Sequence, residues 1–185
     1  MDSTLAPEGT WTYARMLAEL PPESRVELID DELYELPMPT PYHQKISFRL
    51  QLAMYQFIQT EQLGEVFAAP VDVVLNEQRV IQPDLVFISA ERQALIQKVI
   101  SGAPDLAVEI ISPTSVVRDR VTKKDLYEAH GVREYWLVDP ANRDIEVFVL
   151  DNGRYRLDNY ALGTGPVRSV ILPGLEVRAE TIFEP

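Results

Sequence analysis

The sequence predicts one α/β domain in which helices pack against a mixed β-sheet. Helical segments alternate with groups of short strand-like segments, a pattern typical of a sheet covered by helices. The 185 residues are enough for one hydrophobic core, and the 46% hydrophobic and 25% charged residues are close to an average globular composition. No internal repeat or linker divides the chain, so residues 1–185 are expected to form a single domain.

Two helices are expected in the first third of the chain. Thr12–Leu20 reads as a short helix that stops at Pro21-Pro22, because proline lacks the amide donor that continues a helix. At Thr40-Pro41 a hydroxyl side chain precedes a proline, which is typical of a helix start. Apolar residues then recur at helical spacing, so this helix should run to about Leu63 and end at Gly64.

The rest of the chain alternates between strands and one further clear helix. That helix is expected over Val117–His130, with Gly131 as its left-handed cap, while Ala90–Ile100 reads as helix or loop. Asp105–Ser112 is strongly apolar and is expected to be a central strand covered on both faces. The remaining predicted strands are Arg25–Ile29, Leu33–Leu36, Glu65–Ala69, Val71–Leu75, Val80–Ile88 with a break at Pro83, Glu134–Asp139, Ile145–Leu150, and one each near Tyr155 and Val170.

Composition narrows the function classes. The net charge is −12, with 29 acidic against 17 basic residues, whereas proteins that grip a phosphate backbone are usually basic. A role on nucleic acid would therefore need a local basic patch, a metal that screens the site, or a partner chain. The absence of cysteine excludes disulfides and cysteine–zinc sites, and neither a phosphate-binding glycine loop nor a nucleophile-elbow serine occurs. Without a membrane-spanning run or a signal peptide, the expected location is the cytoplasm.

Two carboxylates interrupt segments that should be buried. Glu109 lies inside the apolar run Asp105–Ser112, and Asp84 directly precedes the apolar residues of another predicted strand. An unpaired charge in a low-dielectric interior is costly, so a divalent cation could compensate both acids if the strand ends lie close together. In the alternative interpretation, Asp84 caps a turn after Pro83 and Glu109 pairs with a buried arginine.

Glu27 and Lys123 are further candidates, each with a structural alternative. Strand alternation places Glu27 on the face opposite its apolar neighbours, which an ordinary solvated strand face explains equally well. A lysine such as Lys123 beside a metal site could stabilise charge on a phosphate in the transition state. However, Asp119 and Lys123 are spaced i,i+4, as in an ordinary surface ion pair on a helix.

The two histidines are too few for a histidine-rich metal site. A structural role is favoured for His130, because it precedes Gly131 at the end of a helix, where a cation complements the dipole. His43 lies in the first turn of the long helix and is interpreted as a structural or positioning residue. The segment Tyr135-Trp136-Leu137 is expected to belong to the core.

Taken together and in order, these residues resemble the Uma2 family of bacterial restriction endonucleases, within the PD-(D/E)XK nuclease superfamily. The similarity runs from about Thr12 to the turn Pro173-Gly174-Leu175. It is carried by Arg25–Asp30 (RVELID), His43-Gln44, Gln82-Pro83-Asp84, Ala103–Ser115 (APDLAVEIISPTS), Asp119, Lys123, Tyr127 and Gly131–Pro140 (GVREYWLVDP).

The resemblance implies a restriction-endonuclease-like core, with a metal site at one edge of a mixed sheet. Asp84 would be the acid of the "PD" element, Glu109 the second acid, and Glu27 an acid contributed from near the first helix. The superfamily usually places a lysine two residues after the second acid, where this chain has Ile111. Members with this departure are thought to supply the lysine from the following helix, which points to Lys123, with Lys124 as the alternative.

Two hypotheses follow for the function. In the first, the protein is a metal-dependent endonuclease that hydrolyses DNA phosphodiester bonds. Asp84, Glu109 and a backbone carbonyl near Ile110 would bind Mg²⁺ or Mn²⁺, Lys123 would hold the attacking water, and Glu27 would orient the lysine or a second metal. In the second, the chain is a catalytically inactive binding or regulatory module on the nuclease fold, as its acidity and Ile111 suggest. Under both hypotheses self-association is expected, with a homodimer favoured.

Overall fold

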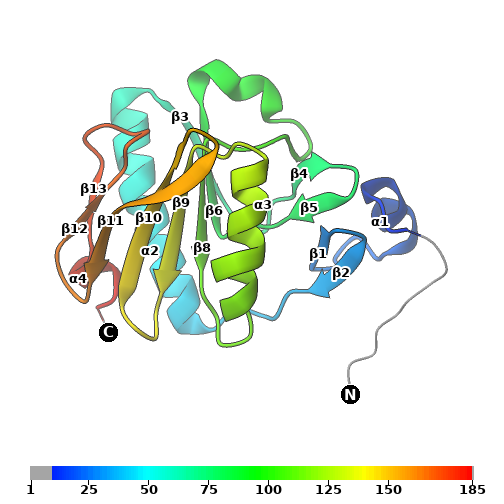
Figure 1. Cartoon of the computed structure of the whole chain (residues 1–185), viewed down its shortest axis with the longest axis horizontal. Coiled ribbons are helices and arrows are strands. Elements are labelled where there is room, and N and C mark those ends of the chain that lie inside the picture. The colour runs from blue at the N-terminus through cyan, green and yellow to red at the C-terminus, as the bar shows by residue number, and fades with distance from the viewer. Residues whose placement is uncertain (1–9, 185) are drawn as a thin grey trace.

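The computed structural model describes residues 10–184 and is built around a six-stranded mixed sheet (Figure 1). The strands run in the spatial order Arg154–Leu162 (β11), Asp144–Asp151 (β10), Glu134–Asp139 (β9), Leu106–Ile110 (β8), Leu85–Ser89 (β6) and Gly64–Ala68 (β3). Neighbours β8 and β9 are parallel, and all other neighbouring pairs of this sheet are antiparallel. The predicted mixed sheet is therefore confirmed.

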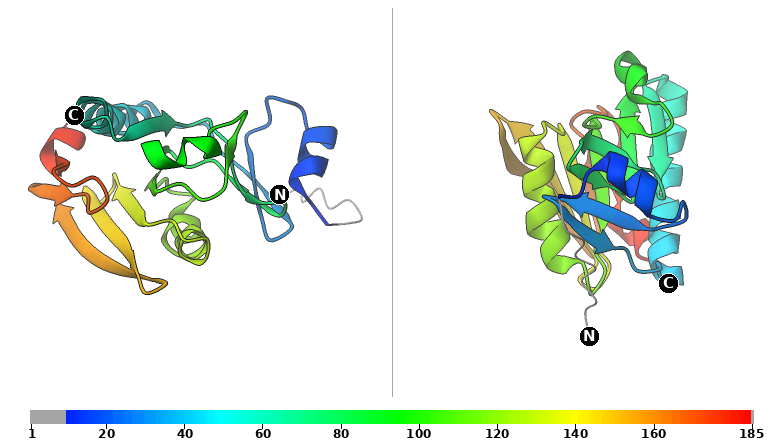
Figure 2. Two further views of the ribbon diagram at one scale, coloured as in Figure 1. Left: turned by 90° about the horizontal axis from the view of Figure 1, so that it is seen from above. Right: turned by 90° about the vertical axis from the view of Figure 1, so that its right-hand side faces the viewer.

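Helices cover both faces of this sheet. Pro41–Glu61 (α2) lies on one face, and Arg118–Lys123 (η2) followed by Lys124–Ala129 (α3) lies on the other (Figure 2). The buried residues of α2 recur every four residues or so, as its apolar spacing predicts, and are Ile46, Leu50, Met54 and Ile58. Alternation along β8 sends Leu106, Val108 and Ile110 into the core beneath α2, and Ala107 and Ile111 into the core beneath α3.

The ends of α2 form as its sequence predicts. The side chain of Thr40 accepts a hydrogen bond from the backbone N–H of His43 at 3.2 Å, and Pro41 occupies the first turn. At the other end, Gln62 adopts a left-handed conformation and is followed by Gly64, which starts β3. This helix therefore spans the sheet from end to end with fixed termini.

A second, five-stranded sheet adjoins the first. Its order is Glu32–Glu35 (β2), Val26–Ile29 (β1), Arg79–Ile81 (β5), Val73–Asn76 (β4) and Ile100–Ser101 (β7), and Tyr13–Glu19 (α1) packs beside it. The predicted stretch Val80–Ile88 is therefore two strands in two sheets. Pro83 stands between β5 and β6, as expected of a residue that cannot donate to a ladder.

Other boundaries differ from those predicted. The segment Ala90–Ile100 contains a 3₁₀ helix over Ala90–Leu95 (η1) and then enters β7. The helix predicted over Val117–His130 begins with the π-helical turn η2, and Gly131 has the expected positive φ of 77°. The strand predicted near Val170 is Pro166–Arg168 (β12), which pairs with Glu176–Arg178 (β13) before the short helix Ala179–Ile182 (α4). None of the helices between residues 10 and 184 is both long and apolar enough to cross a membrane.

Candidate active site

Asp84 and Glu109 lie on neighbouring strands at the same end of the larger sheet. In the antiparallel pairing of β6 with β8, Leu85 is opposite Val108, so Asp84 lies one residue beyond that pair, next to Glu109. The carboxylate of Asp84 does not cap a local turn. Its Oδ2 accepts a hydrogen bond of 2.7 Å from the backbone N–H of Ile110 on β8. The two acids are thus held together by the sheet itself.

Glu109 faces the α3 side of the sheet, where it meets a lysine and not the arginine considered above. The Lys123 ammonium donates to Glu109 Oε1 at 2.9 Å, and the Tyr127 hydroxyl donates to the same oxygen at 2.5 Å. Both partners come from the helical segment that follows β8. All three side chains are buried. Lys123 is therefore close to the second acid although the strand position usually taken by the lysine holds Ile111.

Glu27 reaches the same lysine from the second sheet. Its side chain is completely buried, which rules out the solvated strand face considered above. Glu27 Oε1 lies 2.7 Å from Lys123 Nζ and accepts a hydrogen bond of 3.0 Å from the backbone N–H of Gln82. Glu27 Oε2 has no hydrogen-bond partner among the described residues, and Arg118 Nη1 lies 3.8 Å from it.

Asp119 completes the cluster and was not among the predicted site residues. Its Oδ1 lies 3.7 Å from Lys123 Nζ, and its Oδ2 accepts a short hydrogen bond from the Ser115 hydroxyl. Asp119 and Lys123 are each only 3% exposed, so their i,i+4 spacing marks a buried pair and not a surface pair. The i,i+4 spacing is visible in the sequence, but only the burial of the two side chains shows that they belong to the site and not to the surface.

The cluster carries more negative than positive charge. Glu27, Glu109 and Asp119 share Lys123, and Arg118 lies near Glu27 alone. Asp84 adds a fourth negative charge that acts on Glu109. Burial raises the pKa of Glu109 well above its usual range, and the neighbouring acids add to this although Lys123 opposes it. Burial likewise raises the pKa of Asp119. Burial alone would lower the pKa of Lys123, but Glu109 and Glu27 outweigh it and raise the pKa, so the lysine stays charged.

Of the remaining polar candidates, His43 belongs to the site, and Lys124 and His130 do not. His43 Nε2 lies 3.2 Å from the backbone carbonyl oxygen of Ile110 and 3.4 Å from Asp84 Oδ1. Lys124 instead points its ammonium at the ring of Phe148, 3.9 Å from the centroid. His130 contacts the backbone oxygen of Leu126 on its own helix, in keeping with the structural role expected for it. Tyr135, Trp136 and Leu137 are buried, as expected of core residues.

The donor atoms at this site fit a hard divalent cation. No group of three or more His, Cys, Asp or Glu side chains in residues 10–184 is arranged as a metal-binding cluster. Mg²⁺, however, is commonly held by one or two carboxylates and several waters. Asp84 Oδ1 and the Ile110 carbonyl oxygen both lie within 3.4 Å of one His43 atom. Glu109 Oε2 accepts no hydrogen bond from the described residues, since Lys123 and Tyr127 both use Oε1. Glu109 Oε2 is therefore available to such an ion, and Asp84 Oδ1 and the Ile110 carbonyl oxygen become available when the ion displaces the contacts with His43 Nε2.

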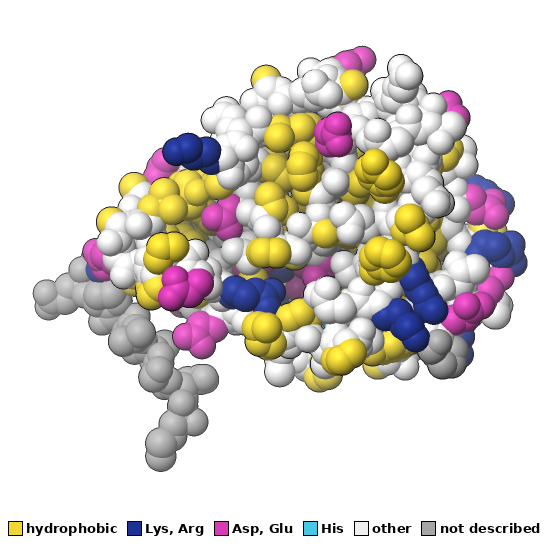
Figure 3. Space-filling view, turned by 180° about the vertical axis from the view of Figure 1, so that it is seen from behind, with side chains coloured by type: hydrophobic (Ala, Val, Ile, Leu, Met, Phe, Trp, Pro, Cys, Tyr) yellow, Lys and Arg dark blue, Asp and Glu magenta, His cyan; other side chains and the backbone are white. Residues whose placement is uncertain are grey.

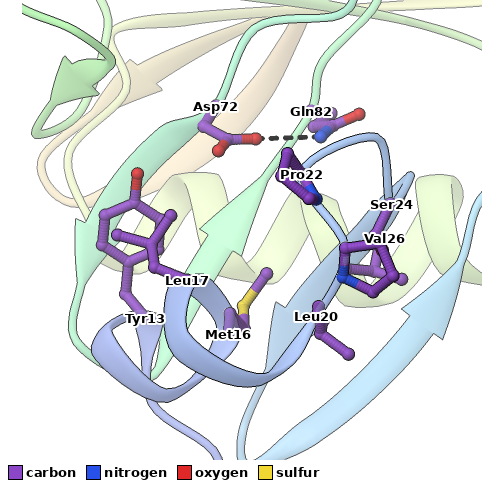
Figure 4. Close-up of a pocket in the computed structure, with 10 residues that line it drawn as sticks. Tyr13, Met16, Leu17, Leu20, Pro22, Ser24, Val26, Asp72 and Gln82 are labelled. Atoms are coloured by element: carbon purple, nitrogen blue, oxygen red, sulfur yellow. Dashed lines mark hydrogen bonds between the residues drawn. The ribbon is translucent and has the colours of Figure 1, made fainter.

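The surface of the molecule is hollowed in more than one place. Seen from the α2 side, acidic side chains lie in a recess near the centre of the face, beside a basic side chain (Figure 3). A separate hollow of about 240 Å³ lies between α1 and the second sheet, and Asp72 and Gln82 at its rim are joined by a 2.8 Å hydrogen bond (Figure 4). Its other walls are largely apolar, among them Met16, Leu20 and Val26. The chemically active groups are therefore concentrated around Lys123 and not in this hollow.

Known proteins are similar to this chain in sequence and in fold. The model of the Uma2 family, described as "Putative restriction endonuclease", matches residues 12–180. The crystal structure of a putative nuclease belonging to DUF820 from Anabaena variabilis has a TM-score of 0.75 and 18% identity, and the alignment covers 93% of this chain and 97% of that one. The type IIG restriction endonuclease BpuSI aligns with a TM-score of 0.39 and 18% identity, over 61% of this chain and 12% of that one. None of the curated proteins matches.

Proposed function

The chain belongs to the Uma2 family, and from this membership and the cluster around Lys123 we propose that it is a metal-dependent nuclease that hydrolyses phosphodiester bonds in DNA. One observation carries the proposal. Asp84 and Glu109 lie side by side on adjacent strands, and Glu109 lies 2.9 Å from the Nζ of the buried Lys123. Buried acids that outnumber the nearby cations destabilise a fold, so such groups of acids are typical of functional sites. A divalent cation would offset the excess negative charge.

Each residue of the site would have a distinct role. Asp84 Oδ1, Glu109 Oε2 and the carbonyl oxygen of Ile110 would hold Mg²⁺ or Mn²⁺. A bound divalent ion would lower the pKa of a water molecule that it binds and would neutralise charge on the scissile phosphate. Lys123, kept charged by its acidic neighbours, would hold the attacking water and stabilise the negative charge that builds on the phosphate.

Glu27 would act through the lysine. Its contact of 2.7 Å with Lys123 Nζ fixes the ammonium from the side opposite the helix that carries it. Its own position is fixed by the backbone N–H of Gln82, which is two residues before Asp84. A shift of the strand that carries Glu27, or of the segment that carries Gln82 and Asp84, would therefore move Lys123 and Asp84 together.

Self-association is part of this proposal. Three large apolar residues on the outer face of α2 are exposed and spaced so that they form one stripe: Phe48 at 63%, Leu52 at 43% and Tyr55 at 50% exposure. Two copies joined along this stripe would present two sites to the two strands of a duplex. Analytical ultracentrifugation of the wild type and of a Phe48→Glu variant would measure it. A monomer at micromolar wild-type concentration contradicts the dimer.

Cleavage assays test the nuclease proposal directly. Purified protein with Mg²⁺ or Mn²⁺ should cut supercoiled plasmid and linear DNA, and Asp84→Asn or Glu109→Gln should reduce the rate about 100-fold or more. Glu65→Gln, which removes an exposed carboxylate on β3, is the matched control and should cut at the wild-type rate. A wild-type protein that cuts no DNA with either metal, or an Asp84→Asn variant with unchanged cleavage, contradicts the proposal.

The alternative function is an inactive binding module on the same fold. The net charge of −12 and the complete enclosure of Lys123 by three carboxylates favour it, because an enclosed ammonium cannot reach a phosphate without rearrangement. Titration calorimetry separates the two functions. Divalent-ion binding that is lost on Glu109→Gln supports the nuclease, and no binding at millimolar metal supports the module.

A further inference from the structure

His43 occupies the position between the atoms proposed to hold the cation. Its Nε2 is within 3.4 Å of both Asp84 Oδ1 and the carbonyl oxygen of Ile110. The side chain is 15% exposed, so the ring is enclosed by protein on most sides. In this structure the ring donates toward oxygens that a divalent ion would also contact.

The ring has no competing anchor. Its other nitrogen, Nδ1, is buried and has no hydrogen-bond partner among the described residues. The polar contacts found for the ring within residues 10–184 are therefore those to the Asp84 and Ile110 oxygens. A cation that takes these two oxygens removes both acceptors of Nε2. When the ring carries its proton on Nδ1 in place of Nε2, the lone pair of Nε2 can bind the same cation.

The backbone of His43 keeps the ring at the site. Its N–H donates to the Thr40 side chain at 3.2 Å, within a first turn that Pro41 also restrains. These contacts fix the backbone of His43 beside the site, and the ring can still adjust its position by turning about its side-chain bonds. A ring that is held here and released from its two acceptors is suited to be a ligand.

We propose that His43 is the fourth protein ligand of the metal, beside Asp84, Glu109 and the carbonyl oxygen of Ile110, and that, through it, the site prefers Mn²⁺ to Mg²⁺. The inference rests on the proposed function and refines it, because two carboxylates and a carbonyl alone would suit Mg²⁺. An imidazole nitrogen binds the later divalent metals better than it binds magnesium, and among these two ions it favours Mn²⁺.

Pulsed electron paramagnetic resonance of protein-bound Mn²⁺ tests this assignment, since it detects a directly bound imidazole nitrogen. The chain has two histidines, so His130→Gln is a matched control outside the site. The wild type and His130→Gln should both show the nitrogen coupling, and His43→Gln should lose it. Titration should also show that His43→Gln raises the Kd for Mn²⁺ about tenfold or more, with a smaller change for Mg²⁺.

The outcomes separate the two proposals. Mn²⁺ that binds the wild type without nitrogen coupling, or coupling that persists in His43→Gln, overturns the role of His43 and leaves the proposed nuclease intact. A wild type that binds Mg²⁺ but no Mn²⁺ overturns only the role of His43, and one that binds neither ion overturns both proposals. If His43→Gln does not fold, His130→Gln protein labelled with ¹⁵N-histidine gives the same answer. Its one remaining histidine is His43, and a coordinated histidine must change its nuclear coupling pattern on labelling.

Discussion

Strand β8 carries a buried carboxylate near each end, and the two have opposite surroundings. Asp105, just before the strand, is fully buried and accepts hydrogen bonds from the backbone N–H of Ser89 and from Arg92 and Arg133. These donors outweigh burial and lower its pKa. Glu109 shares one lysine with other acids, and its pKa is raised. A buried acid that accepts hydrogen bonds from several donors stabilises the fold. A region in which buried acids outnumber the nearby cations is instead suited to bind a further cation.

Removing Lys123 should produce the largest loss of stability. Lys123→Met leaves Glu27, Glu109 and Asp119 buried together without their shared ammonium, which should cost about 3–5 kcal/mol of unfolding free energy. Urea denaturation measures the loss. Lys124→Met is the control, because Lys124 lies over the Phe148 ring outside the cluster and should cost about 1 kcal/mol or less. Equal stability of the two variants would break the comparison.

Asp105→Asn should cost less but should still destabilise the protein. It replaces charge-assisted hydrogen bonds from Ser89, Arg92 and Arg133 with weaker neutral ones, at about 1.5–3 kcal/mol. DNA cleavage by the folded variant should be unchanged, because Asp105 lies at the opposite end of β8 from Glu109 and its partners Ser89, Arg92 and Arg133 are not residues of the site. Cleavage that falls together with stability would mean that the two ends of the strand are not independent.

Glu109→Gln should change the unfolding free energy least, by about 1 kcal/mol or less. The glutamine keeps an oxygen for Tyr127 and Lys123, and it removes a charge that burial disfavours. The same denaturation series measures it beside Asp105→Asn. A loss as large as that of Asp105→Asn would mean that Glu109 stabilises the fold in the same way as Asp105.

The dependence of the unfolding free energy on pH should also distinguish Asp105 from Glu109, because the pKa of Asp105 is lowered and that of Glu109 is raised. Because its pKa is lower in the folded than in the unfolded protein, its contribution is fully present above the unfolded value of about 4 and is lost as the pH falls through the folded value. The stability difference between wild type and Asp105→Asn should therefore be constant at neutral pH and shrink below about pH 4. Thermal melts at a series of pH values measure it, and a difference that grows on acidification contradicts it.

Local signals in the sequence predicted much of the fold. The start of α2 depends on two adjacent residues, the capping Thr40 and Pro41, and β8 depends on a continuous apolar run. Asp84 and Glu109 stood out because they interrupt such runs. Their proximity follows from the β6–β8 register, which depends on packing across the whole sheet and cannot be obtained from either segment alone.

The rest of the site depends on long-range contacts. His43 meets Ile110, 67 residues further along the chain, and nothing near His43 in the sequence distinguishes it from a solvated histidine. The choice between Lys123 and Lys124 depends on η2, a π-helical turn that apolar spacing does not reveal. Glu27 belongs to a different sheet, so its contact with Lys123 requires knowing how the two sheets meet.

Gly64 fixes the far end of the helix that carries His43. A Cβ atom at this position would lie 2.1 Å from the backbone oxygen of Ile88, and its φ of +146° disfavours any side chain. Helix α2 is 21 residues long, so about 30 Å separates this joint from the histidine. If the helix tilts at Gly64, the atoms at its other end move the furthest. The conformation of Gly64, which carries no functional group, can therefore determine the position of the His43 imidazole at the opposite end of the helix.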